Sequence, residues 1–137
     1  MGWWRIGGET EEVIGDGPAD AVASLLARIP ASGILEFLDA LAAAARRIPG
    51  YDAGRITLLL GDGRRLSSQD NAANDALRET MEGVLKAVTV VYQNDLERPP
   101  TLREVLEVFE FVLRPEPERY LRGMKDVRIS MITAEPS

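Results

Sequence analysis

Residues 56–67, ITLLLGDGRRLS, decide the expected fold because they join a strand signal to a turn signal. The run from Ile56 to Leu60 is continuously apolar and of strand length, which is typical of a buried central strand. Gly61-Asp62-Gly63 follows it, and Asp-Gly is the strongest short-range signal for a hairpin turn. The stretch therefore predicts a central strand whose chain returns beside it at residues 64–67.

Two other segments also have the features of strands. Val127, Ile129 and Met131 alternate with polar residues, the pattern of a half-buried strand, and we expect this segment in the same sheet. Residues 3–6, WWRI, are expected to form a short strand that ends at two glycines. The order in which the strands pair does not follow from the sequence.

Apolar residues recur at three- and four-residue steps in four segments, which predicts four helices. The segments are residues 18–29, 32–47, 71–94 and 101–113, and residues 118–122 are expected to add one further turn. Thr101 and Glu104 have the spacing of a capping box, in which each side chain binds the other residue's backbone N–H. This signal places the start of the fourth helix.

These elements predict an α+β fold, with about four or five helices packed on one face of a small mixed or antiparallel sheet of three to four strands. The chain has 137 residues, close to the usual size of one domain, and contains no linker-like stretch. We therefore expect residues 1–137 to form a single domain.

The composition restricts the chemistry that the protein can perform. It contains no His and no Cys, which removes imidazole bases, thiol nucleophiles and nearly every zinc site. The net charge is −6, which argues against binding to nucleic acid or to anionic lipid. We accordingly predict no catalytic residue, metal, cofactor, nucleic-acid or membrane partner, and we expect the protein not to be an enzyme.

The sequence also bears on where the protein works. The first residues, Met1 to Ile6, lead into glycines and acids and do not form an apolar signal segment. No stretch approaches the about 20 apolar residues that a membrane span requires. Since cysteine is absent as well, we expect a cytoplasmic protein.

Four residues are candidates for contact with a partner. If residues 3–6 form a strand, Trp3 and Arg5 lie on one side of it and Trp4 on the other, so one tryptophan enters the core and the other can be exposed. An exposed Trp beside an Arg is the composition of an interface hot spot. Val108 and Phe111 widen the apolar stripe of the fourth helix nearly around it, so this helix is either central to the core or shared with a partner.

A second group of candidates lies in the hairpin turn. Gly61, Gly63, Arg64 and Arg65 could bind an anion through glycine N–H groups and guanidinium groups, although an ordinary turn with exposed arginines has the same sequence. An acidic stretch near the N-terminus could supply paired carboxylates for catalysis, or could simply be solvated. Its members are Glu9, Glu11, Glu12, Asp16 and Asp20.

The sequence thus favours a protein that binds another protein through an acidic and partly apolar surface, as an accessory, adaptor or immunity-type subunit. The partner is either a different protein or a second copy of this chain, in a homodimer. The alternative is a small enzyme or anionic-ligand-binding domain that uses carboxylates and arginines, such as Asp62 with Arg64 and Arg65.

Overall fold

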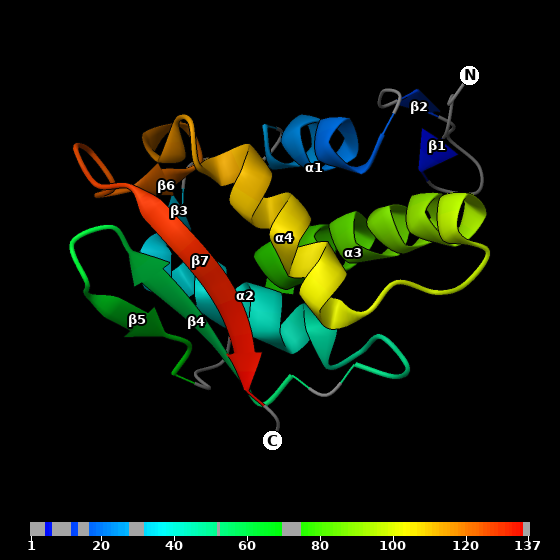
Figure 1. Ribbon diagram of the computed structural model, residues 1–137, viewed down its shortest axis with the longest axis horizontal. Helices are drawn as coiled ribbons and strands as arrows, with labels where there is room; N and C mark the ends of the chain where they lie inside the picture. The colour runs from blue at the N-terminus through cyan, green and yellow to red at the C-terminus, as the bar shows by residue number, and fades with distance from the viewer. Residues whose placement is uncertain are drawn as a thin grey trace.

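The computed structural model describes residues 5–6, 12–13, 17–27, 32–51, 53–69 and 75–135. Figure 1 shows how their helices and strands are arranged. In chain order they are β1 (Arg5–Ile6), β2 (Glu12–Val13), α1 (Pro18–Leu26), β3 (Ser32–Gly33), α2 (Ile34–Ala45), β4 (Arg55–Leu60), β5 (Arg65–Ser67), α3 (Asp75–Leu96), α4 (Leu102–Leu113), the 3-10 turn η1 (Pro117–Arg119), β6 (Leu121–Arg122) and β7 (Ile129–Glu135). The α+β class expected from the sequence is confirmed.

The main sheet has three antiparallel strands in the order β5-β4-β7. The continuous apolar run forms the central strand β4, and the chain returns through the hairpin turn to β5, as the sequence predicts. The last strand was expected at residues 127–131 but runs from Ile129 to Glu135. It begins later because residues 124–127 close a turn, in which the Val127 N–H donates to the Met124 carbonyl at 3.3 Å.

Two pairs of very short strands complete the described β-structure. β1 and β2 pair in antiparallel fashion, whereas β3 and β6 pair in parallel with Ser32 opposite Leu121. The sequence analysis assigned residues 32–33 to the start of a helix and residues 118–122 to a helical turn. The helical turn is present as the 3-10 turn η1, Pro117–Arg119, but residues 121–122 and residues 32–33 are strands instead. Strands of two residues are too short to show an alternating pattern.

The helices form two layers beside the sheet. α2 contacts β4 and β5, and α4 contacts β7 (Figure 1). In the outer layer, α3 packs against α2 and α4, and α1 packs against α4 and α3. α2 is thin on its buried side because Ala40, Ala44 and Ala45 are fully buried there, and this allows α3 to pack close to it.

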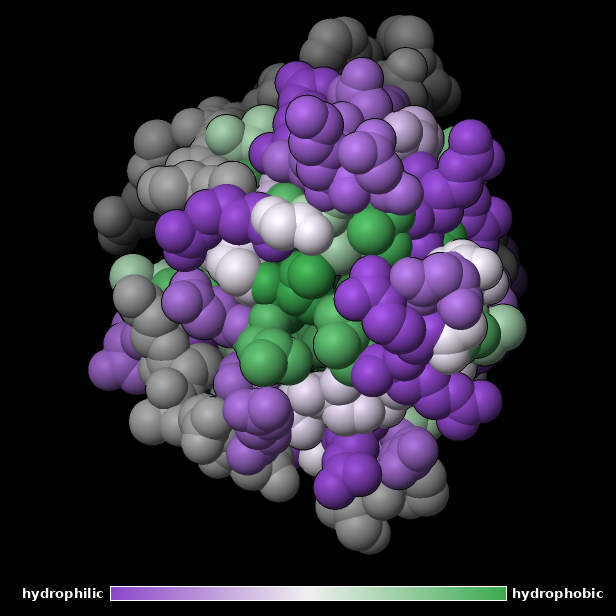
Figure 2. All heavy atoms as spheres, turned by 90° about the vertical axis from the view of Figure 1, so that its left-hand side faces the viewer, coloured by the Kyte–Doolittle hydropathy of each residue, from purple (hydrophilic) through white to green (hydrophobic). Residues whose placement is uncertain are grey.

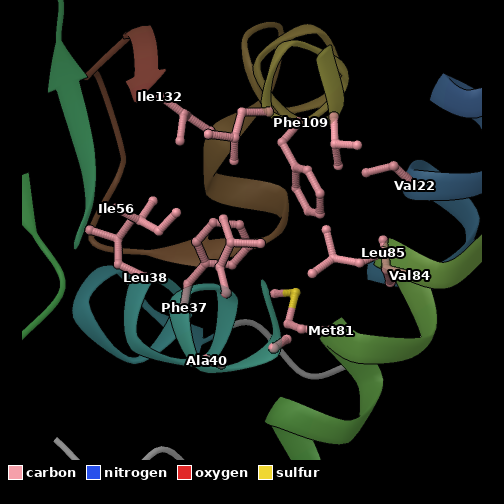
Figure 3. Packing of buried hydrophobic residues seen from close by; sticks show 14 of the residues in the cluster. Val22, Phe37, Leu38, Ala40, Ile56, Met81, Val84, Leu85, Phe109 and Ile132 are labelled. Atoms are coloured by element: carbon pink, nitrogen blue, oxygen red, sulfur yellow. The ribbon is translucent and has the colours of Figure 1, made fainter. Parts of the chain in front are cut away.

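One hydrophobic core joins the helices to the sheet. Phe37 of α2 and Phe109 of α4 meet edge to face, with ring centroids 6.2 Å apart and planes at 64°. Figure 3 shows these two rings between the sheet and the outer helices. Fully buried residues from the other elements surround them: Val22 from α1, Ile56 from β4, Met81, Val84 and Leu85 from α3, and Ile132 from β7. The apolar stripes of all four helices thus converge on one interior.

The start of α4 is the capping box that the sequence predicts. The Thr101 hydroxyl accepts from the Glu104 N–H at 3.2 Å, and the Glu104 carboxylate accepts from the Thr101 N–H at 2.9 Å. The Arg98 guanidinium adds two hydrogen bonds to the same carboxylate, at 2.8 and 3.0 Å. Hydrogen bonds from Arg98 and from Thr101 lower the pKa of Glu104 from 4.5 to about 2.

The lowered pKa of Glu104 predicts a pH-dependent contribution to stability. A carboxyl whose pKa falls on folding stabilises the protein fully above its unfolded value, here near 4.5, and loses this effect as the pH falls toward 2. Wild type is therefore expected to exceed Glu104→Gln in free energy of unfolding above pH 5, and the difference should shrink steadily as the pH falls from 5 to 2. Urea denaturation of both proteins across this pH range measures the difference in free energy of unfolding.

Glu79→Gln is the matched control for this pH series. The Glu79 carboxylate is exposed on α3 and lies 4.0 Å from Arg78, at the limit of an ion pair. We expect its difference from wild type to stay small at every pH. A Glu104→Gln difference that stays constant from pH 7 to pH 2 would contradict the role of the Arg98 and Thr101 contacts.

Candidate functional site

The N-terminal partner-binding candidates are only partly covered by the structure. Trp3 lies outside the described residues. The backbone of Arg5 forms β1 and pairs with Val13 of β2, while its side chain lies outside the described part. The prediction that Trp3 and Arg5 contact a partner therefore stays a prediction.

The glycine N–H groups of the hairpin turn, which were candidates for binding an anion, already have partners within the protein. The Gly61 N–H donates to the Arg128 carbonyl at 2.8 Å, and the Gly63 N–H donates to the Leu60 carbonyl at 3.0 Å. Arg64 binds Asp62 through both its backbone N–H and its guanidinium. Arg65 is exposed on β5. The turn thus offers an anion no free glycine amide, and the interpretation as an ordinary hairpin turn agrees better with its hydrogen bonds.

Of the acidic candidates near the N-terminus, the structure describes the side chain of Asp20. Glu9, Glu11 and Asp16 lie outside the described residues, and so does the side chain of Glu12; Asp20 is exposed on α1. The hydrogen bond from the Arg64 N–H lowers the pKa of Asp62, which sits on the exposed turn. Within the described ranges, no group of three or more acidic side chains could hold a metal ion.

The two candidates on α4 have opposite environments. Val108 is 6 % exposed and belongs to the core, whereas Phe111 is 70 % exposed. Three other large apolar side chains are exposed in the described part, but each less so: Leu35 at 38 %, Met131 at 41 % and Val90 at 50 %. Phe111 is thus the apolar side chain in this set with the most surface available to a partner.

Three grooves meet at Phe111. The largest, about 730 Å³, lies between the end of α4, η1 and the β6–β7 connection, and its lining includes Pro115, Pro117 and Val127. The other two, about 240 and 280 Å³, run along the junction of α1 and α4 and share Ala19 as well as Phe111. We call Phe111 together with these three grooves the Phe111 surface. A single aromatic ring stands at its centre, between a large groove of mixed polarity and two smaller grooves along α1.

The rim of the Phe111 surface is charged. Its arginines are Arg114, Arg119 and Arg128, and its acidic residues are Asp20, Glu107, Glu116, Glu118 and Asp126. An apolar centre within a polar rim is the usual anatomy of a protein–protein interface. The backbone beneath it is held by prolines, whose rings fix φ and reduce the ordering that binding would require.

Apolar surface is not confined to α4. Figure 2 looks onto the side where the β4–β5 turn and the β6–β7 connection lie, and shows apolar side chains in a hollow ringed by hydrophilic ones. Leu35, in the first turn of α2, is the exposed large apolar residue of that helix. No exposed aromatic ring is recorded among the described residues apart from Phe111, so the aromatic anchor distinguishes the Phe111 surface.

Sequence analysis missed a buried charged residue on α4. Glu110 is 7 % exposed, and its carboxylate accepts from the Ile132 N–H of β7 and from Arg103, both at 2.7 Å. Arg103 also donates to the Ile132 carbonyl, and Arg114 donates to the Ser130 carbonyl at 2.9 Å. We call Arg103, Glu110 and Arg114 the β7 clamp. The three charged side chains occupy the hydrogen-bonding positions that a neighbouring strand would fill.

A second buried carboxylate, Asp39 on α2, was also missed. It is 8 % exposed and accepts from the Gln69 N–H at 2.6 Å, while Ser68 accepts from the Ile56 N–H at 3.1 Å. These two contacts fasten the end of β5 to α2 and to β4. Asp39 and Glu110 therefore act as acceptors for backbone N–H groups at the two sides of the sheet.

Comparisons with protein-family models, with curated proteins and with solved structures give no significant match for this chain. None of the helices in the described ranges combines the length and the apolar character that crossing a membrane demands. Function must therefore be inferred from the surface itself.

Proposed function

We propose that this protein acts by binding another protein through the Phe111 surface, as a cytoplasmic accessory, adaptor or immunity-type subunit without enzymatic activity. The observation that carries the proposal is the 70 % exposure of Phe111 at the junction of three grooves. Aromatic side chains that fill a partner's pocket are typical interface hot spots.

The energetics of Phe111 support this role. Burying an exposed phenylalanine contributes about 1.5–3 kcal/mol, which corresponds to roughly a tenfold to hundredfold change in affinity. Phe111 follows the buried Phe109 by two positions, so it faces away from the core while remaining on a helix whose other side is fixed there. An aromatic side chain has only two rotatable bonds, so it loses little conformational freedom when a partner covers it.

The composition also favours binding over catalysis. Without imidazole or thiol, catalysis would require carboxylates whose protonation is tuned by burial or by neighbouring charges. Around Phe111 the acidic side chains Glu116, Glu118 and Asp126 are exposed instead. The protein is therefore better suited to recognition by shape and charge than to bond-making.

Site-specific photo-crosslinking tests the proposed function. A benzophenone side chain is introduced in place of Phe111 in one sample of full-length protein and in place of Val90 in another, and both are irradiated in cells of the source organism. Val90 is 50 % exposed on α3 and lies outside the three grooves, so it controls for chance encounters. We expect a discrete covalent adduct with one protein from position 111 and none from position 90.

The sizes of the adducts separate the possible partners. An adduct of twice the chain mass, together with a dimer in sedimentation analysis, would identify a second copy as the partner. Equal labelling at the two positions, or no adduct at position 111, would contradict a docking role for the Phe111 surface.

A further inference from the structure

The charges around Phe111 are not balanced once internal contacts are considered. Arg114 lies 4.0 Å from the Glu110 carboxylate, and Arg119 lies 3.7 Å from Glu116. Glu107 is likewise paired with Arg103, at 3.2 Å. The charged groups of this surface that already have partners thus largely neutralise one another.

The unpaired groups of the Phe111 surface are mainly negative. Asp20, Glu118 and Asp126 have no ion-pair partner in the part of the chain that the structure describes, and among the arginines the same holds for Arg128. Three carboxylates therefore face one guanidinium around an exposed phenyl ring. With a net charge of −6 on the whole chain, the field at this surface attracts cations.

The two smaller grooves have a length and a lining that suit the binding of a helix. They follow α4 from Glu107 to Val112 and continue to Pro115, about two turns of helix. Among the side chains of α1 that the structure describes, Ala19, Ala23 and Asp20 line these grooves. Small residues permit close approach of another backbone. A groove between two helices, with apolar walls and a charged rim, is a common site for an amphipathic helix.

We propose that the Phe111 surface binds a basic amphipathic helix of a partner protein, with apolar side chains against Phe111. Lys or Arg of this helix would lie near Asp20, in one of the smaller grooves, and near Glu118, in the adjoining large groove. This inference rests on the proposed function and specifies its partner. The same charges disfavour a second copy of this chain, because two surfaces with excess negative charge would face each other. They also repel nucleic acid and anionic membranes.

A model peptide provides the test. The probe is a fluorescent peptide of about 14 residues, with leucines at helical spacing and lysines elsewhere. Its glutamate counterpart and a lysine peptide without leucines serve as comparisons. We expect full-length protein to bind the leucine–lysine peptide, measured by fluorescence anisotropy, and to bind the other two at least about tenfold more weakly. Affinity should fall between about 50 and 500 mM salt.

Substitutions locate the binding. Phe111→Ser should raise the Kd about tenfold or more, because the aromatic contact is lost, while Val90→Ser should leave it unchanged. The double variant Asp20→Lys with Glu118→Lys should raise it about tenfold. Asp126 is kept, since its φ of +63° favours Asp over Lys.

A matched double variant controls for net charge. Asp75→Lys with Glu79→Lys alters the total charge equally, and Asp75 lies in the first turn of α3 as Asp20 does in α1. We expect this variant to raise the Kd less than about threefold, through long-range attraction alone. Equal loss in the two double variants would overturn the inference, as would tighter binding of the glutamate peptide.

The peptide and crosslinking experiments can contradict the two proposals separately. An adduct between position 111 and a different protein would support the proposed function. If the Asp20→Lys, Glu118→Lys variant nevertheless binds the peptide as tightly as wild type, the proposal of a basic helix as the partner is wrong. If position 111 gives no adduct and the peptide does not bind, both proposals are wrong.

Discussion

Replacing Glu110 with alanine is expected to lower the free energy of unfolding by about 2–4 kcal/mol. The substitution removes the acceptor of the buried Ile132 N–H and the partner of the Arg103 guanidinium in one step. A buried donor without an acceptor loses its hydrogen bonds to water and gains nothing in return, so the folded state carries the whole penalty. Urea denaturation followed by circular dichroism measures the change.

Two further variants separate charge from hydrogen bonding in the β7 clamp. Glu107→Ala removes another carboxylate that contacts Arg103, but this carboxylate is 58 % exposed, so the expected loss is below about 1 kcal/mol. Glu110→Gln keeps an acceptor for Ile132 and should fall between the two alanine variants. A Glu110→Ala protein as stable as Glu107→Ala would show that the clamp does not hold β7.

Replacing Phe109 with alanine is expected to cost about 3–5 kcal/mol of stability, the largest loss predicted for a single core position here. Phe109 is fully buried, meets Phe37 at 6.2 Å and lies among residues of the sheet and the outer helices. The cavity would border several elements at once, and the surrounding side chains could not all close it. Urea denaturation gives the loss directly; if the alanine variant does not fold, Phe109→Leu should lose a smaller, measurable amount.

Phe111→Ala is the matched control for this core substitution. It removes the same side chain two positions later on the same helix, where the ring is 70 % exposed, and should change stability by less than about 0.5 kcal/mol. Similar losses at the two positions would mean that Phe111 packs within the fold. That result would also weaken its role as a binding residue.

The parts of the fold that sequence predicted are those with local signals. The apolar run 56–60, the Asp-Gly turn and the capping box at Thr101 each act over a few residues, and each appears in the structure as expected. The predicted ends of the helices were less accurate. The first helix was expected to reach residue 29, whereas α1 ends at Leu26. The third was expected over residues 71–94; α3 extends to Leu96, and residues 71–74 lie outside the described part.

The features that sequence did not reveal depend on contacts between distant segments. The parallel pair β3–β6 joins residues 32–33 to residues 121–122, and nothing local indicates it. Glu110 stands between two phenylalanines, and its spacing from Arg103 and Arg114 fits an ordinary exposed charged stripe. Only the position of β7 explains why this carboxylate is buried. Likewise, sequence identified Phe111 as surplus apolar surface, but the grooves around it arise from α1, η1 and the β6–β7 connection.

The β7 clamp has a consequence for association between molecules. An open sheet edge invites pairing with another chain, which leads to domain swapping or to fibrous aggregates. Arg103, Glu110 and Arg114 occupy that edge of β7 with charged groups, so an incoming strand would have to displace several ionic contacts. The other edge of the main sheet, β5, spans only Arg65–Ser67 and carries a positive charge. The two edges of the main sheet therefore resist pairing with a strand of another molecule, although the aromatic ring of Phe111 is exposed to solvent.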